Sequence, residues 1–210
     1  MSRKQKIFSS SIIKFKENFI LLFLITSLIA GVITGALFIN AQHSAVSDKL
    51  TVKLQEYIAS WNGAGFFESV ISALKSTAPF YIISVLLSFT SISLPIELGL
   101  PFVYSLGYGT VIGYIYSTNH FSGIVYVLIM IALPFALSSL MLIFSMKESI
   151  RISTLQFKFL RNGWANSTFP DMNSEMKLAV FRQFFYFVFL VLSAFIKSIN
   201  IVLFRDLIHI

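Results

Sequence analysis

The stretch from Phe19 to Ile39 reads FILLFLITSLIAGVITGALFI and contains no charged residue. An α-helix rises 1.5 Å per residue, so this run is long enough to cross roughly 30 Å of hydrocarbon. The apolar core of a secretory signal peptide is typically about 7–15 residues, which is shorter than this run. The sequence therefore predicts an uncleaved first transmembrane helix over residues 19–39.

The rest of the chain also has the composition of a membrane protein. Of the 210 residues, 56% are hydrophobic and 12% are charged, whereas an ordinary soluble domain carries about a quarter charged residues. Further apolar segments lie at residues 79–95, 98–117, 124–146 and 184–204. We predict an all-α fold, a polytopic membrane helix bundle of five transmembrane helices, that forms a single membrane domain over residues 1–210.

The polar segments between these spans carry amphipathic patterns. Residues 1–16 contain basic but no acidic side chains, which is typical of a cytoplasmic surface anchor. Residues 42–76 have apolar residues at helical spacing, and we expect extracytoplasmic interfacial helices there, the second over 66–77. Residues 147–182 read as a basic loop on the cytoplasmic membrane surface.

Basic residues predict the orientation, because they concentrate in cytoplasmic loops. The two most basic segments, 1–16 and 147–182, fall on the same side when the chain has five spans. We expect a cytoplasmic N-terminus and an extracytoplasmic C-terminus. The heavy use of Phe, Ile, Ser, Asn and Lys indicates an AT-rich bacterial genome, and hence a bacterial cell membrane.

The net charge of +7 raises the question of what the chain binds. Its basic residues lie beside apolar spans and not in patches interleaved with aromatic residues, so we expect membrane lipids as partners and no nucleic acid.

Glycines in two spans predict close helix packing. Gly31 and Gly35 form a GxxxG pattern, which suits either a homo-oligomer or packing inside the bundle. Gly107, Gly109 and Gly113 lie in the third span, and the last two share a helical face. They favour close contact with the first or fourth helix, or else irregular backbone around a substrate cavity, as in transporters.

Pro134 interrupts the fourth span, where it removes one backbone hydrogen bond and predicts a kink. Ser138 and Ser139 lie one turn further on, and we expect them to satisfy the freed carbonyl group.

Two charged residues are candidates for function. Glu97 falls between the second and third spans, where we expect an interfacial, solvated carboxylate; inside the membrane it would suit a proton or cation carrier. Lys197 lies deep in the fifth span, and we expect it to extend past Asn200 toward the outer headgroups. The predicted topology puts these two residues near opposite membrane faces, which disfavours pairing.

No pattern in the sequence indicates catalysis. The chain has no cysteine, its three histidines show no metal-ligand spacing, and Gly63-Ala64-Gly65 is not followed by the lysine of a P-loop. No GxSxG and no intramembrane aspartate pair occurs. We expect no catalytic residue, no metal, no cofactor and no enzymatic activity.

Several sequence marks follow one another along the chain: GVITGA at 31–36, SISLP at 91–95, PFVYSLGYG at 101–109, FSG at 121–123 and LP at 133–134. Their order and spacing resemble the stage II sporulation protein M family over about residues 17–205. The members of that family are five-span bacterial membrane proteins, which agrees with the independent count of spans.

The resemblance implies a non-enzymatic membrane scaffold that recruits peptidoglycan-degrading engulfment proteins, stage II sporulation proteins D and P, to the septum. Related chains occur in circular-bacteriocin gene clusters, often beside an ABC transporter ATPase. There the implied role is peptide maturation, export or immunity. The sequence thus leaves two functions open, a sporulation scaffold and a membrane component of a transport or bacteriocin system.

Overall fold

The computed structural model describes residues 3–41, 52–56, 65–90, 93–162 and 172–204. These residues form five long helices and no strand: α1 (Arg3–Ala41), α3 (Phe66–Ser88), α4 (Leu94–Tyr126), α5 (Leu133–Asn162) and α6 (Met172–Phe204). A π-helix, η1 (Val127–Ala132), joins α4 to α5. Each long helix includes a stretch that is long and apolar enough to cross a membrane, so the predicted all-α polytopic bundle is confirmed.

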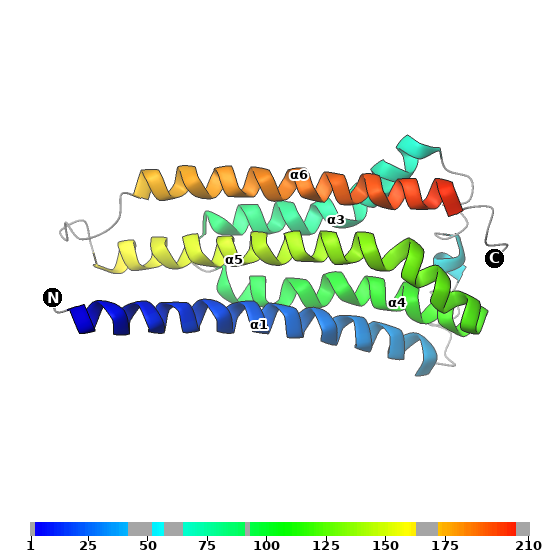
Figure 1. Ribbon diagram of the computed structural model, residues 1–210, viewed down its shortest axis with the longest axis horizontal. Coiled ribbons are helices and arrows are strands. Elements are labelled where there is room, and N and C mark those ends of the chain that lie inside the picture. Colours follow the sequence, from blue (N-terminus) through cyan, green and yellow to red (C-terminus); the bar gives the residue numbers. More distant parts are fainter. Residues whose placement is uncertain (1–2, 42–51, 57–64, 91–92, 163–171, 205–210) are drawn as a thin grey trace.

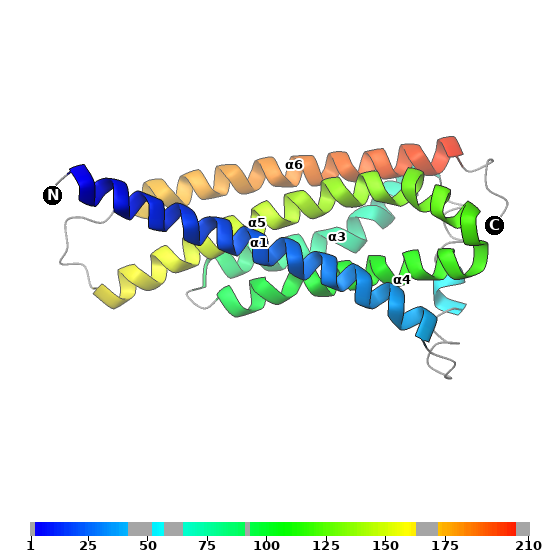
Figure 2. The ribbon, with the colours of Figure 1, turned by 60° about the horizontal axis from the view of Figure 1, so that its bottom comes forward.

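The long helices lie side by side and alternate in direction (Figure 1). α1 packs mainly on α4, whereas α3, α5 and α6 pack on one another. Figure 2 shows α1 crossing the other helices obliquely. The starts of α1, α4 and α6 mark one end of the bundle, which we call the N-terminal end, and the opposite end is the C-terminal end.

The bundle exposes apolar side chains and buries polar ones. Leu22, Phe67 and Leu203 are 62%, 75% and 66% exposed, while Ser84 and Ser145 are fully buried. This distribution suits lipid surroundings, because lipid tails accept apolar side chains and polar groups must find partners inside the protein.

Residues 66–77, predicted as a separate interfacial helix, are continuous with the second span in one helix, α3, and all of it is apolar enough to belong to the span. Its amphipathic pattern arises because Ser69 and Thr77 face the bundle interior. Gly65 begins the helix, and its N–H donates to Glu68 Oε2 at 3.1 Å in a capping interaction. Of the remaining predicted extracytoplasmic segment, the structure describes only the short helix 52–56.

The other predicted boundaries move in the same direction, toward longer helices. The predicted anchor is continuous with the first span from Arg3 onward. α5 runs to Asn162 and α6 starts at Met172, so most of the expected basic loop 147–182 is helical. The chain reverses direction between the third and fourth spans. Gly123 lies against Ile115, eight residues earlier, whereas a straight, unbroken helix would place these two residues about 12 Å apart.

Glycines form the contact between α1 and α4. A Cβ atom at Gly31 would collide with Phe102, and one at Gly35 would lie 2.9 Å from the backbone nitrogen of Thr110. On the α4 side, a Cβ at Gly109 would lie 2.9 Å from Val32 Cα, and a Cβ at Gly113 would lie 2.8 Å from Ala36 Cα. The GxxxG face of α1 is therefore filled by α4 of the same chain.

The break at Pro134 is supported by α6 and not by the neighbouring serines. A π-turn pairs residues five apart, so the N–H that Pro134 lacks would have bonded the carbonyl of Ile129. Asn200 Nδ2 donates to that carbonyl at 3.0 Å instead. Ser138 and Ser139 donate to the carbonyls three residues before them, so the prediction that they satisfy the freed group is wrong.

Candidate functional site

The interior of the bundle is lined by buried polar side chains on α3, α4, α5 and α6. Those that are fully buried are Ser84, Ser93, Glu97, Ser105, Ser145, Ser149 and Ser198. Polar and ionisable residues inside membrane bundles face the interior or a cavity, and they mark paths for ions or substrates. This polar interior is the candidate functional site.

A hydrogen-bonded group joins three helices inside the bundle. Ser145 Oγ on α5 donates to Gln183 Oε1 on α6 at 2.7 Å and lies 3.3 Å from Ser84 Oγ on α3. Gln183 Nε2 returns a bond to the Ser145 carbonyl at 3.1 Å. The Tyr81 hydroxyl donates to the backbone carbonyl of Gln183 at 2.6 Å. We call Ser84, Ser145 and Gln183 the polar bridge.

Glu97 lies beside the polar bridge and has no exposed surface. The hydroxyl groups of Ser84 and Ser149 face its carboxyl group, yet neither carboxyl oxygen makes a hydrogen bond of ordinary geometry among the described residues. The expectation of a solvated interfacial carboxylate is wrong, because α4 begins at Leu94 and carries Glu97 into the bundle in its first turn.

Lys197 is also buried, with 6% of its surface exposed. Its Nζ lies 5.8 Å from the centroid of the Tyr108 ring, within the range of a cation–π interaction. The expectation that it extends to the outer headgroups is therefore wrong. Tyr108 follows Glu97 by three turns of α4, about 16 Å, so Glu97 and Lys197 occupy different levels of the bundle.

A cavity of about 320 Å³ adjoins Lys197. Residues from the helix 52–56, α3, α4, η1 and α6 line it: Leu54, Ser76, Phe80, Val103, Tyr104, Gly107, Tyr108, Thr110, Val111, Ile131 and Lys197. Tyr104 is central to its wall, since its ring lies 5.3 Å from Phe80 and 5.2 Å from Tyr108, and its hydroxyl lies 2.8 Å from Ser138 Oγ. We call this the lysine cavity. Gly107 opens onto it, since a Cβ there would meet nothing within 4 Å.

Charged residues tie α5 to α6 nearer the N-terminal end. Glu148 accepts hydrogen bonds from Arg151 at 2.8 Å and from Arg182 at 3.2 Å, and Arg151 also bonds Glu175 at 2.8 Å. The Glu148 side chain is 8% exposed. Sequence reasoning missed this cluster because it placed Glu148 in a solvated loop. Serines at 145, 149 and 153, four residues apart, were the available signal that the helix continues.

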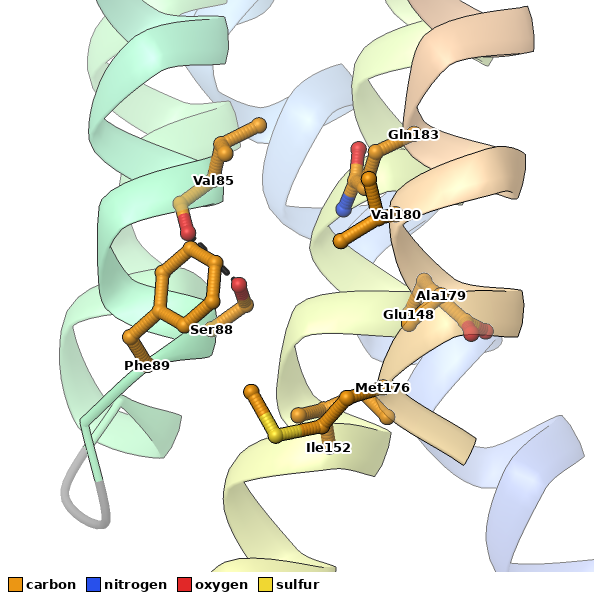
Figure 3. Close-up of a pocket in the computed structure, with 9 residues that line it drawn as sticks. All are labelled: Val85, Ser88, Phe89, Glu148, Ile152, Met176, Ala179, Val180 and Gln183. Atoms are coloured by element: carbon orange, nitrogen blue, oxygen red, sulfur yellow. Dashed lines mark hydrogen bonds between the residues drawn. The ribbon is translucent and has the colours of Figure 1, made fainter. Parts of the chain in front are cut away.

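A second cavity, of about 150 Å³, lies between this charged cluster and the polar bridge. Figure 3 shows Val85 and Ser88 of α3, and Phe89 directly after it, on one side of this cavity and residues of α5 and α6 on the other. Gln183 and Glu148 both line this cavity, which we call the bridge cavity. It places Gln183 of the polar bridge beside a small, mostly apolar space between α3, α5 and α6.

Comparisons with protein-family models, with curated proteins and with solved structures found no match to this chain. Among the described residues, no group of three or more His, Cys, Asp or Glu side chains is placed to hold a metal ion.

Proposed function

We propose that this chain is the membrane component of a transport or export system and that the lysine cavity binds its cargo. The observation that carries the proposal is a buried lysine on the wall of a 320 Å³ cavity between the membrane helices. Ligand pockets are usually about 300–1,000 Å³ in volume, mostly apolar, with a few placed polar groups. Placing a lysine at bilayer depth costs about 2.5–3.5 kcal/mol on insertion scales, so a lysine inside a membrane bundle is a candidate functional residue.

The chemistry of the lysine cavity favours an apolar cargo with an anionic group. Phe80, Tyr104 and Tyr108 supply aromatic surface, and Lys197 supplies the positive charge. An apolar peptide with a free C-terminal carboxylate has both features. Since the sequence contains no P-loop, we propose that a partner such as an ABC transporter ATPase supplies the energy.

Cysteine labelling tests whether the lysine cavity is accessible, because the natural chain has no cysteine. We expect Ser76→Cys and Gly107→Cys, both on the cavity wall, to react with a small water-soluble maleimide in liposomes. Ser105→Cys is the matched control on α4, since Ser105 is fully buried against α1. Equal protection of all three cysteines would count against a binding cavity.

Flux in liposomes tests the cargo. We expect the protein to speed release of an apolar peptide with a free carboxylate more than that of its amidated form. Lys197→Met should remove this difference, whereas Leu128→Ile, at an exposed apolar site, should preserve it. If the protein leaves both fluxes unchanged, with or without a partner ATPase, the transport proposal is wrong.

The second candidate is the membrane scaffold that the sequence resemblance implies. α6 has 33 residues and is about 50 Å long, which exceeds the roughly 30 Å hydrocarbon core. Its ion pairs with α5 would stiffen a projection on which partner proteins could assemble. Co-purification of cell-wall hydrolases and a sporulation block on deletion would support this role, whereas normal sporulation without the gene would contradict the engulfment version.

A further inference from the structure

Buried oxygen atoms without hydrogen-bond partners gather at one place in the bundle. Among the described residues these are Ser69 Oγ, Ser93 Oγ, both carboxyl oxygens of Glu97, and Ser149 Oγ. All but Ser69 belong to facing turns at the start of α4 and in α5. Buried polar atoms in native proteins are almost always paired, so such a cluster requires an explanation.

The residues around Glu97 come from neighbouring turns of α3, α4 and α5. Ser93, the residue before α4, lies one turn ahead of Glu97, and the Ser93 N–H contacts Ser153 Oγ on α5 at 3.4 Å. One turn earlier on α5, the Ser149 hydroxyl faces the Glu97 carboxyl group, as does Ser84 from α3. The side chains of Ser84, Ser93, Glu97 and Ser149 are all fully buried.

We propose that Glu97, with the hydroxyl groups of Ser84, Ser93 and Ser149, binds a monovalent alkali cation such as Na⁺. Hard cations prefer oxygen ligands, and every side-chain donor in this cluster is an oxygen. One carboxylate balances one positive charge, whereas a divalent ion would leave a net charge buried away from water. The nearby arginines, Arg151 and Arg182, are engaged with Glu148 and Glu175.

The polar bridge connects this site to the bridge cavity by hydrogen bonds. Ser84, which faces Glu97, lies 3.3 Å from Ser145, and Ser145 bonds Gln183. Gln183 lines the bridge cavity together with Ser88 and Glu148 (Figure 3). The site is separate from the lysine cavity, whose α4 residues begin two turns further along, so the inference does not depend on the proposed transport of cargo.

Thermal unfolding of the purified full-length protein in detergent tests the site. The melting temperature is measured in NaCl, KCl, CaCl₂ or choline chloride at constant pH and ionic strength. We expect a saturable increase in Na⁺, by roughly 5–10 °C at a concentration 100 times Kd. Glu97→Gln, which preserves shape but removes charge, should abolish the increase, and Ser149→Ala should raise Kd at least about tenfold.

Glu175→Gln is the control, because Glu175 is a partly exposed carboxylate in an ion pair with Arg151; this variant should retain the full Na⁺ effect. If Glu97→Gln fails to fold, Ser93→Ala and Ser149→Ala together carry the test. The proposal is overturned if the melting temperature is the same in Na⁺ and choline, if it follows pH but not the cation, or if Ca²⁺ stabilises more than Na⁺.

Discussion

Ser193 of α6 donates a hydrogen bond of 2.8 Å to the backbone carbonyl of Pro134. The bond is buried and joins the last span to the point where the fourth span changes from a π-helix to an α-helix. It acts together with Asn200, which bonds Ile129 on the other side of the break. The irregular backbone is thus stabilised by the neighbouring helix, as membrane proteins require.

Replacing Ser193 by Ala should lower the free energy of unfolding by about 0.5–1.5 kcal/mol, because the Pro134 carbonyl loses a buried partner. Ser117→Ala is the matched control, since the exposed Ser117 hydroxyl donates to the Tyr114 carbonyl of its own helix. Denaturant unfolding in detergent micelles measures both variants. Equal effects would mean that the bond across the two helices contributes nothing.

The glycine contact between α1 and α4 predicts opposite effects at neighbouring glycines. Gly109→Ala should destabilise the bundle by about 1–3 kcal/mol, because its Cβ would lie 2.9 Å from Val32 Cα on a packed backbone. Gly107→Ala should be neutral or stabilising, because its Cβ position is open and Ala favours a helix by up to about 1 kcal/mol. Thermal unfolding of both variants measures the two effects. A loss of stability in Gly107→Ala but not in Gly109→Ala would contradict the observed packing of α1 on α4.

The number of spans could be predicted from the sequence because an apolar run of about 20 residues is long enough to cross the hydrocarbon core as a helix and is rare in other structures. The face shared by Gly109 and Gly113 could also be predicted from helical spacing. The partner helix could not, since small residues fit against the first or the fourth helix equally well. The observed contacts of Gly109 with Val32 and of Gly113 with Ala36 place the first helix there.

The buried polar residues were harder to place, for a physical reason. Glu97 and Glu148 look like loop residues when charge is taken as a sign of solvent. Inside a membrane bundle polar groups face inward, so charge and serine spacing mark the interior as readily as the surface. The same ambiguity made residues 66–77 look interfacial, although Ser69 and Thr77 point into the bundle.

The charged cluster between α5 and α6 should depend on Glu148 more than on Glu175. Glu148→Gln removes the carboxylate that Arg151 and Arg182 share, which is 8% exposed, and should cost about 1.5–3 kcal/mol. Glu175→Gln removes a pair whose side chains are 29% and 27% exposed, and should cost about 1 kcal/mol or less. Thermal unfolding of the two variants checks the order, and a larger loss at Glu175 would contradict it.

Labelling in intact cells tests the arrangement in the membrane. Lys53 lies in the short helix near the C-terminal end of the bundle, and Lys158 lies in the last turns of α5 near the N-terminal end (Figure 1). Both side chains are exposed, so a cysteine at either position should be reachable by a reagent from its own side.

We expect Lys53→Cys to react with a membrane-impermeant maleimide in intact cells, and Lys158→Cys to react only after the cells are permeabilised. The expectation rests on the basic segments being cytoplasmic, since Lys158 belongs to one of them. The reverse pattern would invert the orientation but preserve the five spans. Equal reaction of both cysteines in intact cells would mean that the two ends of the bundle lie on the same side of the membrane. That result would contradict a chain that crosses the membrane between them.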